Sequence, residues 1–315
     1  MLFKNLTERQ YLLLAAAGNL LVGIVGLVVA FASDSEAILL DGLFNLTYFV
    51  SSLFAIKIAA LLAAGDNDKY PLGYGYFEPL INGLKGVLVF GVALMALFSS
   101  LFALFDGGRV VDPELAVGYG AFATLIGWLV FAFTHVGHKY TDSPLVKTDK
   151  ENWLINALIS SCVLVAFAGI HLLNTLGLPE YAPYVDPVVV LTVVVISLPV
   201  PYKMAKYAVL QLLNRTPDVH LVDSAKTEIV ETLDGLDVQA LYVRVLQPGR
   251  SRMVIAQAVV APTADLSLAQ QDKLRLNAYQ KLNQAHPHTT LDLTFTFDSG
   301  WGLPKSQGGY FGLAS

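Results

Sequence analysis

Two pairs of polar residues, each four residues apart, lie inside hydrophobic segments of this chain. Asp41 and Asn45 form one pair, and Asn152 and Asn156 form the other. Residues four apart share one face of a helix. Polar groups inside a bilayer are costly and usually face a protein interior or a water-filled path. Two such helices could place one carboxylate and three amide oxygens around a cation.

Each pair belongs to a longer polar stripe. The stripes consist of Asp34, Asp41, Asn45, Tyr48 and Ser52 in the first segment and of Thr148, Asn152, Asn156 and Ser160 in the second. One interpretation is a cation path between two helices, and the other is hydrogen bonding between helices, which Asn and Ser often provide in membranes. Asp41 favours the cation path, because an ionised carboxylate at that depth needs a cation partner or must be protonated.

The composition predicts a membrane domain followed by a soluble domain. Only 14% of the residues are charged and 55% are hydrophobic, whereas soluble domains have about 25% charged residues. Six segments are long and apolar enough to span a bilayer, which takes about 20 residues: 11–32, 37–63, 77–105, 115–138, 152–176 and 187–213. We therefore expect a transmembrane domain of six helices over residues 1–213.

Proline and aspartate mark the ends of some of these helices. Asp112-Pro113 and Asp186-Pro187 each predict an N-cap Asp followed by a Pro at the first helical position. Pro199 and Pro201 predict a kink in the sixth span.

Positive charge predicts the orientation. Arg109 is alone on one side of the predicted spans, and the other side collects Lys4, Arg9, Lys57, Lys69, Lys139, Lys147, Lys150, Lys203, Lys206 and Arg215. Cytoplasmic loops carry the excess of Lys and Arg. We therefore expect both termini in the cytoplasm and a location in a bacterial inner (plasma) membrane.

The last third of the chain has a different pattern. Hydrophobic periodicity predicts a helix over 218–234, strands over 238–247 and 252–260, a helix over 266–285 and a strand over 290–297. This α-β-β-α-β order is typical of a small open-faced α+β sandwich, which we expect over residues 214–298. The Gly-rich tail 299–315 is expected to be poorly ordered.

Several classes of function find no support. The net charge of −5 without a basic stripe argues against a nucleic-acid partner. The single Cys162 excludes an intrachain disulfide and a Cys-cluster metal site. The chain has neither a nucleophile–base set nor a cofactor motif, so we expect no enzyme and no tightly bound cofactor.

Five motifs resemble the cation diffusion facilitator family. Residues 37–45 resemble its second helix, and 70–78 resemble its cytoplasmic loop. Residues 149–161 resemble its fifth helix and 185–187 the start of its sixth. Residues 212–218 resemble its exit into the cytoplasmic domain. Motif order, spacing and six-span topology agree from about residue 5 to residue 298. The chain is identified as a divergent member.

The resemblance implies a homodimeric, proton-coupled exporter of divalent metals with a ferredoxin-like cytoplasmic domain. The family's transport site usually has His or Asp, then Asp four residues later, on both the second and the fifth helix. The matching positions here are Asp41, Asn45, Asn152 and Asn156, so three of the four depart from the pattern.

The departure changes the cation that the site suits. Zinc prefers Cys, His or carboxylate ligands, whereas oxygen ligands suit Mg²⁺, Ca²⁺, Mn²⁺ or a monovalent ion. Asp41 is the one charged metal ligand of the four, so a divalent ion would keep uncompensated charge. Further negative charge could come from Asp34 or Glu36 on the outer side, or from Asp149 or Glu151 on the inner side.

Lys85 allows two interpretations. It lies about three turns into the third span, where Glu78 is two turns earlier on the same face and could pair with it. Alternatively, Lys85 is a resident cation that controls access to the aspartate.

Two hypotheses of different classes follow. The first is a cation efflux transporter in which the transported cation and protons compete for Asp41; the cation is a divalent metal or another hard cation, with a monovalent cation:proton antiporter as the alternative. The second is a transport-incompetent relative that acts as a scaffold through its cytoplasmic domain, which the loss of three charged ligands motivates.

Overall fold

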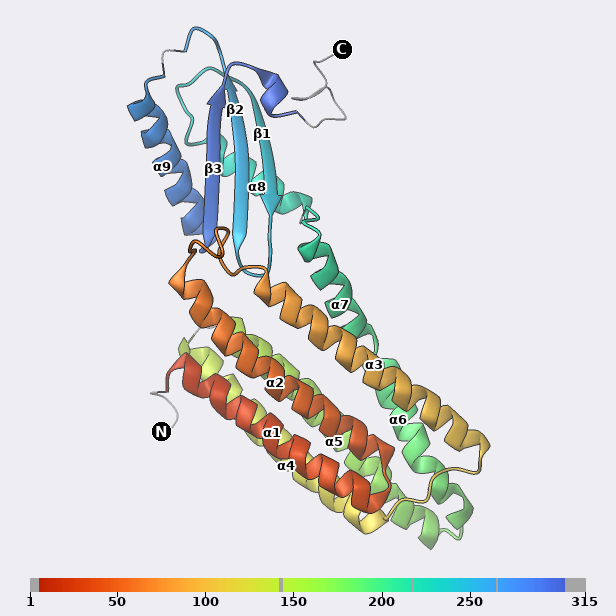
Figure 1. Cartoon of the computed structure of the whole chain (residues 1–315). Coiled ribbons are helices and arrows are strands. Elements are labelled where there is room, and N and C mark those ends of the chain that lie inside the picture. The colour runs from red at the N-terminus through yellow and green to blue at the C-terminus, as the bar shows by residue number, and fades with distance from the viewer. Residues whose placement is uncertain (1–5, 142–143, 217, 265, 304–315) are drawn as a thin grey trace. The chain divides into compact units, whose positions relative to one another are not determined.

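The computed structural model describes residues 6–141, 144–216, 218–264 and 266–303. These residues form two compact units (Figure 1). The helical unit comprises the described residues of Met1–Ala64 and Ile81–Lys206, and the sheet unit comprises those of Gly65–Leu80 and Tyr207–Ser315.

Six helical stretches in the described part of the chain are long and apolar enough to cross a membrane. They are α1 (Glu8–Ser33), α2 (Glu36–Ala64), α3 (Phe77–Phe105), α4 (Pro113–Thr141), α5 (Pro144–Thr175) and a sixth made of α6 (Val185–Ser197) and α7 (Pro199–Leu212), which follows the short 3-10 helix η1 (Pro179–Tyr184). The six predicted spans are confirmed. The sixth is divided between Ser197 and Pro199, where the prolines predicted a kink.

The helical unit has an apolar exterior. Phe31 is 77% exposed and Phe105 is 86% exposed, while Asn45 and Ser160 are buried. Exposed apolar surface around buried polar groups is the arrangement that a bilayer requires. The unit is that of an integral membrane protein.

Small residues let the helices of this unit approach closely. A Cβ atom added to Gly26 of α1 would lie 2.9 Å from the Cα atom of Gly42 on α2, and one added to Gly127 of α4 would lie 3.0 Å from the Cα atom of Ala157 on α5. Small residues at helix contacts are the usual means of close packing in membranes. The backbones of α1 and α2, and those of α4 and α5, are thus in close contact at these positions.

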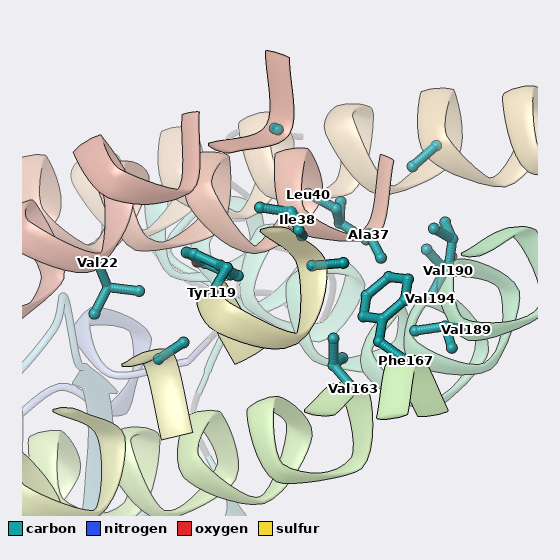
Figure 2. Close-up of a cluster of buried hydrophobic side chains, with 14 of the residues drawn as sticks. Val22, Ala37, Ile38, Leu40, Tyr119, Val163, Phe167, Val189, Val190 and Val194 are labelled. Carbon is teal, nitrogen blue, oxygen red and sulfur yellow. The ribbon is translucent and has the colours of Figure 1, made fainter. Parts of the chain in front are cut away.

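A cluster of buried apolar side chains joins these pairs to α6 (Figure 2). Ile38 of α2, Phe167 of α5 and Val190 of α6 are fully buried in it. Tyr119 of α4 is the polar member of the labelled group, and its hydroxyl belongs to the site described below.

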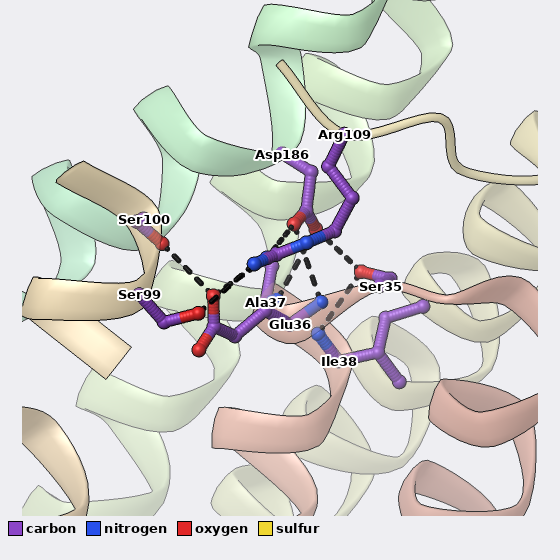
Figure 3. Close-up of polar contacts among 8 residues, drawn as sticks. All are labelled: Ser35, Glu36, Ala37, Ile38, Ser99, Ser100, Arg109 and Asp186. Carbon is purple, nitrogen blue, oxygen red and sulfur yellow. Dashed lines mark hydrogen bonds and ion pairs between the residues drawn. The ribbon is translucent and has the colours of Figure 1, made fainter. Parts of the chain in front are cut away.

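A polar network at the α2 N-terminus corrects one prediction (Figure 3). Asp186 does not cap its own helix, because α6 begins one residue earlier, at Val185. Its carboxylate accepts hydrogen bonds from the backbone N–H groups of Glu36 and Ala37, both at 3.2 Å, and from the Ser35 hydroxyl at 2.6 Å. Asp186 therefore caps α2 from a neighbouring helix, whereas Asp112 caps α4 as predicted.

Arg109 completes the network. Its guanidinium donates to Glu36 at 2.6 Å, to Asp186 at 3.0 Å and to Ser99 at 3.0 Å. Burial on its own would lower the pKa of Arg109, but the hydrogen bonds and charges of Glu36 and Asp186 raise it above its ordinary value. The guanidinium stays charged and ties α2, α3 and α6 together.

The sheet unit has the predicted order of elements. These are α8 (Val219–Val230), β1 (Val238–Leu246), β2 (Arg252–Val260), α9 (Leu268–Ala285) and β3 (Thr289–Thr296). β2 is central, antiparallel to β1 and parallel to β3. Both helices contact the sheet and one another, so they cover one face over a core that includes Ile229, Val254 and Leu282.

Residues 299–303, which the sequence assigns to a poorly ordered tail, have a defined structure. Ser299–Trp301 forms a 3-10 turn, and the carbonyl of Gly302 accepts a hydrogen bond from Arg244 of β1 at 2.9 Å. Residues 304–315 lie outside the described residues.

Residues 65–80 belong to the sheet unit and include Glu78 in the first turn of α3. Its carboxylate accepts hydrogen bonds from the backbone N–H and the guanidinium of Arg250, at 3.0 and 3.2 Å. Nearby, the Tyr76 hydroxyl donates to Asn214 at 2.6 Å. Of the two interpretations of Lys85, the ion pair with Glu78 is wrong, because the β1–β2 turn provides Glu78 with a closer cation.

The contacts of Asp186 in Figure 3 lead to a prediction about the stability of the helical unit. Asp186→Ala should lower the free energy of unfolding by ~3 kcal/mol, because a partly buried guanidinium loses one of its two carboxylate partners and two helix N–H groups lose their acceptor. Unfolding by SDS in mixed micelles measures this loss. The matched control Asp106→Asn, at an exposed position before Arg109, should change stability by less than ~0.5 kcal/mol. Equal stability of the two variants would contradict this account of the cap.

Candidate functional site

A cavity of about 310 Å³ opens between α2, α3, α5 and the two halves of the sixth span. Much of its wall is apolar. Its polar lining residues are Asp41, Tyr48, Lys85, Asn152, Asn156 and Ser197. The structure thus brings residues of both polar stripes to one cavity. Their role as cation ligands stays a prediction.

Asp41 is held by neutral donors. The Tyr119 hydroxyl donates to one carboxylate oxygen at 2.5 Å, and the Asn45 amide donates to the other at 3.2 Å. The chain of hydrogen bonds continues from Asn156 to the Asn45 oxygen at 3.0 Å and from Ser160 to the Asn156 oxygen at 3.3 Å. One connected series of polar groups therefore crosses from α4 through α2 to α5.

The three asparagines differ in what they offer. Asn45 is fully buried and does not line the cavity, since its amide is used by Asp41 and Asn156. Asn156 lines the cavity and is also part of the chain. Asn152 lines the cavity, and its side chain makes no hydrogen bond to any residue that the structure describes. The Thr148 side chain lies outside the described residues.

A second cavity of about 30 Å³ adjoins the first. The two share Tyr48, Lys85, Asn152 and Asn156, and the smaller one adds Asp149 of α5 and Asn19 of α1. The site therefore has two compartments, with Asp41 in the larger and Asp149 in the smaller.

Lys85 lies where the two compartments meet. Its Nζ atom is 4.0 Å from the centroid of the Tyr48 ring, a cation–π contact. It also interacts electrostatically with Asp149. Of the accessory residues suggested by the sequence, Asp149 and Lys85 are thus part of the site.

The other accessory candidates lie elsewhere. Asp34 is exposed in the α1–α2 turn, with a left-handed backbone (φ 55°). Glu36 is occupied by Arg109 and by Ser100. Glu151 is exposed on α5. None of the three lines either cavity.

Tyr119 is the residue that sequence reasoning missed. It is 4% exposed, and a Cβ atom on Gly26 would come within 2.8 Å of its hydroxyl. Only the absence of that atom lets the hydroxyl reach Asp41. The available signal was a tyrosine hydroxyl between Gly118 and Gly120 in the fourth span, which by itself identifies no partner.

The arrangement can hold a hard cation. Within the described part of the chain, no three His, Cys, Asp or Glu side chains gather into a group that could hold a metal ion. The ligands available in the larger cavity are one carboxylate and the amide oxygens of Asn152 and Asn156. Oxygen ligands of this kind suit Mg²⁺, Ca²⁺, Mn²⁺ or a monovalent cation better than zinc.

Comparison with known proteins identifies the family of the transmembrane part. Residues 12–213 match the family described as the Cation efflux transmembrane domain. The manganese efflux system protein MneP of Bacillus subtilis is 22% identical over 231 residues, which cover 70% of this chain and 71% of MneP. An uncharacterized transporter of Methanocaldococcus jannaschii, MJ0449, is 20% identical over 235 residues, or 74% of this chain and 80% of that protein.

A third relative matches over a shorter region. The magnetosome protein MamM of Paramagnetospirillum magneticum is 22% identical over 176 residues, or 56% of this chain. The chain thus spans about half the length of MamM, at 53%.

The contact between Tyr119 and Asp41 makes a second prediction. Tyr119→Phe should lower the free energy of unfolding by ~1.5 kcal/mol, because a buried carboxylate loses its shortest hydrogen bond. In an Asp41→Ala background the same substitution should cost much less, which a double-mutant cycle in mixed micelles measures.

Glycine variants supply the matched control. Gly26→Ala should also weaken the Tyr119–Asp41 coupling, whereas an added Cβ on Gly118 meets nothing within 4 Å, so Gly118→Ala should not. A coupling energy near zero between Tyr119 and Asp41 would refute the assignment.

Proposed function

Because the chain belongs to the cation diffusion facilitator family, whose cation efflux transmembrane domain covers more than half of it, we propose that it exports a cation in exchange for protons. The observation that carries this proposal is the position of Asp41. Its carboxylate lines a cavity inside the helical unit and is bonded to neutral groups, Tyr119 and Asn45.

The exchange follows from the chemistry of one carboxylate. A carboxyl group in a site of low dielectric is favoured with either a cation or a proton bound. A cation entering from the cytoplasm takes the place of the proton on Asp41, and a proton entering from the outside releases the cation. Each turnover then moves the two in opposite directions.

We assign different parts to the asparagines. The amide oxygens of Asn152 and Asn156 contact the cation, since both side chains line the cavity. Asn45 positions the other two groups, since its amide bonds Asp41 and Asn156 at once. The cation is a hard one, bound by oxygen. MneP, a relative named for manganese efflux, makes Mn²⁺ the first cation to test.

The charge distribution supports an orientation with both termini in the cytoplasm. Arg109 is the basic residue in the loops of the other side, and Glu36 and Asp186 neutralise it. The outer side thus carries little free positive charge, which strengthens the positive-inside argument. Location in a bacterial inner membrane and assembly as a homodimer are further parts of the proposal, and the homodimer rests on the family resemblance alone.

Transport assays test the proposal directly. In proteoliposomes with a proton gradient, the wild-type chain should move Mn²⁺ or another hard cation against protons, and Asp41→Ala should reduce the flux at least ~100-fold, because the site loses its charge. Cation uptake and internal pH are followed together.

The matched control is Glu151→Gln, an exposed carboxylate on the fifth span, which should transport like the wild type. If no cation in a panel of Mn²⁺, Mg²⁺, Ca²⁺, Na⁺ and K⁺ moves against protons, the exporter proposal fails. If Asp41→Ala transports normally, the site assignment fails while the transporter survives.

The two roles given to asparagine make a separate prediction. Asn152→Ala should raise the KM for the cation about tenfold and leave stability nearly unchanged, because this amide lines the cavity and makes no hydrogen bond to a described residue. Asn45→Ala should lower both stability and flux, because it breaks two buried hydrogen bonds. Flux kinetics and unfolding in mixed micelles distinguish the two, and identical behaviour of both variants would contradict this division.

A further inference from the structure

Lys85 is a charged group inside the site for which the proposed exchange has no use. Its side chain lines both compartments, beside Tyr48, Asn152 and Asn156. A lysine seven residues after Glu78 on the same helix could have turned toward that carboxylate. Glu78 is instead bonded to Arg250, and Lys85 faces the cavity.

The contacts of Lys85 hold its ammonium group in place without neutralising its charge in a close ion pair. The Tyr48 ring lies 4.0 Å from Nζ, and Asp149 acts on it electrostatically. Neither a hydrogen bond nor an ion pair within 4.0 Å joins Nζ to any residue that the structure describes. The positive charge is therefore fixed at the wall of the cavity and its field reaches the space beside it.

The charges of the site can be counted. Asp41 and Asp149 contribute one negative charge each and Lys85 contributes one positive charge, so the ionised site carries a net charge of one negative unit. The Coulomb energy scales with the product of the charges, so the ammonium opposes a doubly charged ion twice as strongly as a singly charged one. One carboxylate in excess is balanced by one monovalent cation.

We propose that Lys85 is a specificity-determining residue of the transport site, whose fixed ammonium group disfavours divalent cations and shifts the selectivity toward singly charged ones. This inference rests on the proposed function only in using the same cavity. It names a class of substrate that the family resemblance does not suggest, and it follows from the position of one lysine.

Opposite charge changes in two neighbouring residues test the proposal. Lys85→Gln makes the net charge of the site more negative by one unit, Asp149→Asn makes it less negative by one unit, and the double variant restores the original value. A purely structural role of the Lys85–Asp149 pair would make both single variants change cation binding in the same direction.

Binding is measured on the purified full chain in detergent. Thermal stabilisation by increasing MnCl₂ or NaCl, with choline chloride holding the ionic strength constant, gives an apparent Kd for each ion. Lys57→Gln and Glu151→Gln are the matched controls, since both side chains are exposed on spans of the same unit and line neither cavity.

The expected result is a change of selectivity. Lys85→Gln should lower the Kd for Mn²⁺ about tenfold or more and the Kd for Na⁺ by less. Asp149→Asn should raise the Kd for Mn²⁺, and the double variant should return to within about threefold of the wild type. Lys85→Arg, which keeps the charge, should keep the wild-type ratio, as should both controls.

Two outcomes would overturn the proposal: a Mn²⁺-to-Na⁺ ratio unchanged by Lys85→Gln, or single variants that shift it in the same direction. If Lys85→Gln does not fold, Asp149→Asn and the double variant still decide. These binding measurements need no transport. A wild type that binds cations but transports none would refute the exporter proposal, and the role of Lys85 would still be tested by the binding data. If no variant binds either ion, both proposals are refuted.

Discussion

The structure of the helical unit depends on the cost of placing the Asp41 carboxylate inside a membrane. Such a group must be surrounded by donors, by a cation or by a proton. The unit supplies the donors from two helices, the Tyr119 hydroxyl from α4 and the Asn45 amide from α2 itself. Glycine at position 26 makes the first of these contacts possible, because a methyl group there would lie only 2.8 Å from the hydroxyl oxygen and 2.9 Å from the Gly42 Cα atom. A glycine of α1 thus allows the hydrogen bond between Tyr119 of α4 and Asp41 of α2.

The other carboxylates of the unit that are not fully exposed show what distinguishes Asp41. Glu36 and Asp186 share Arg109, and Asp149 has Lys85 within electrostatic range. Among the described residues Asp41 alone of this set interacts with neutral groups only. In the proposed exchange a carboxylate held this way binds a proton or a cation, whereas a carboxylate that already has a resident cation does not. Glu36 and Asp186 thus stabilise helix ends through Arg109, whereas Asp41 lines the cavity.

Lys85 and Asp149 are two charged residues that line the site in addition to Asp41. Their charges offset one another, so the net negative charge of the ionised site equals that of Asp41 alone. Asn152 and Asn156 contribute no charge, so the ionised site carries a net charge of one negative unit. The proposed selectivity for singly charged cations follows from this low net charge.

The sequence by itself determined the six spans, the α-β-β-α-β unit and the meeting of two polar stripes, because hydrophobic length, periodicity and four-residue spacing are local properties of the chain. It predicted that Asp186 caps its own helix, left open whether Lys85 pairs with Glu78, and gave Tyr119 no role. Each of these depends on which residue of a distant segment comes within about 3 Å, and spacing along one helix carries no such information. Only the tertiary structure decided them: Asp186 reaches the free N–H groups of α2, Arg250 reaches Glu78 first, and Gly26 leaves room for the Tyr119 hydroxyl to reach Asp41.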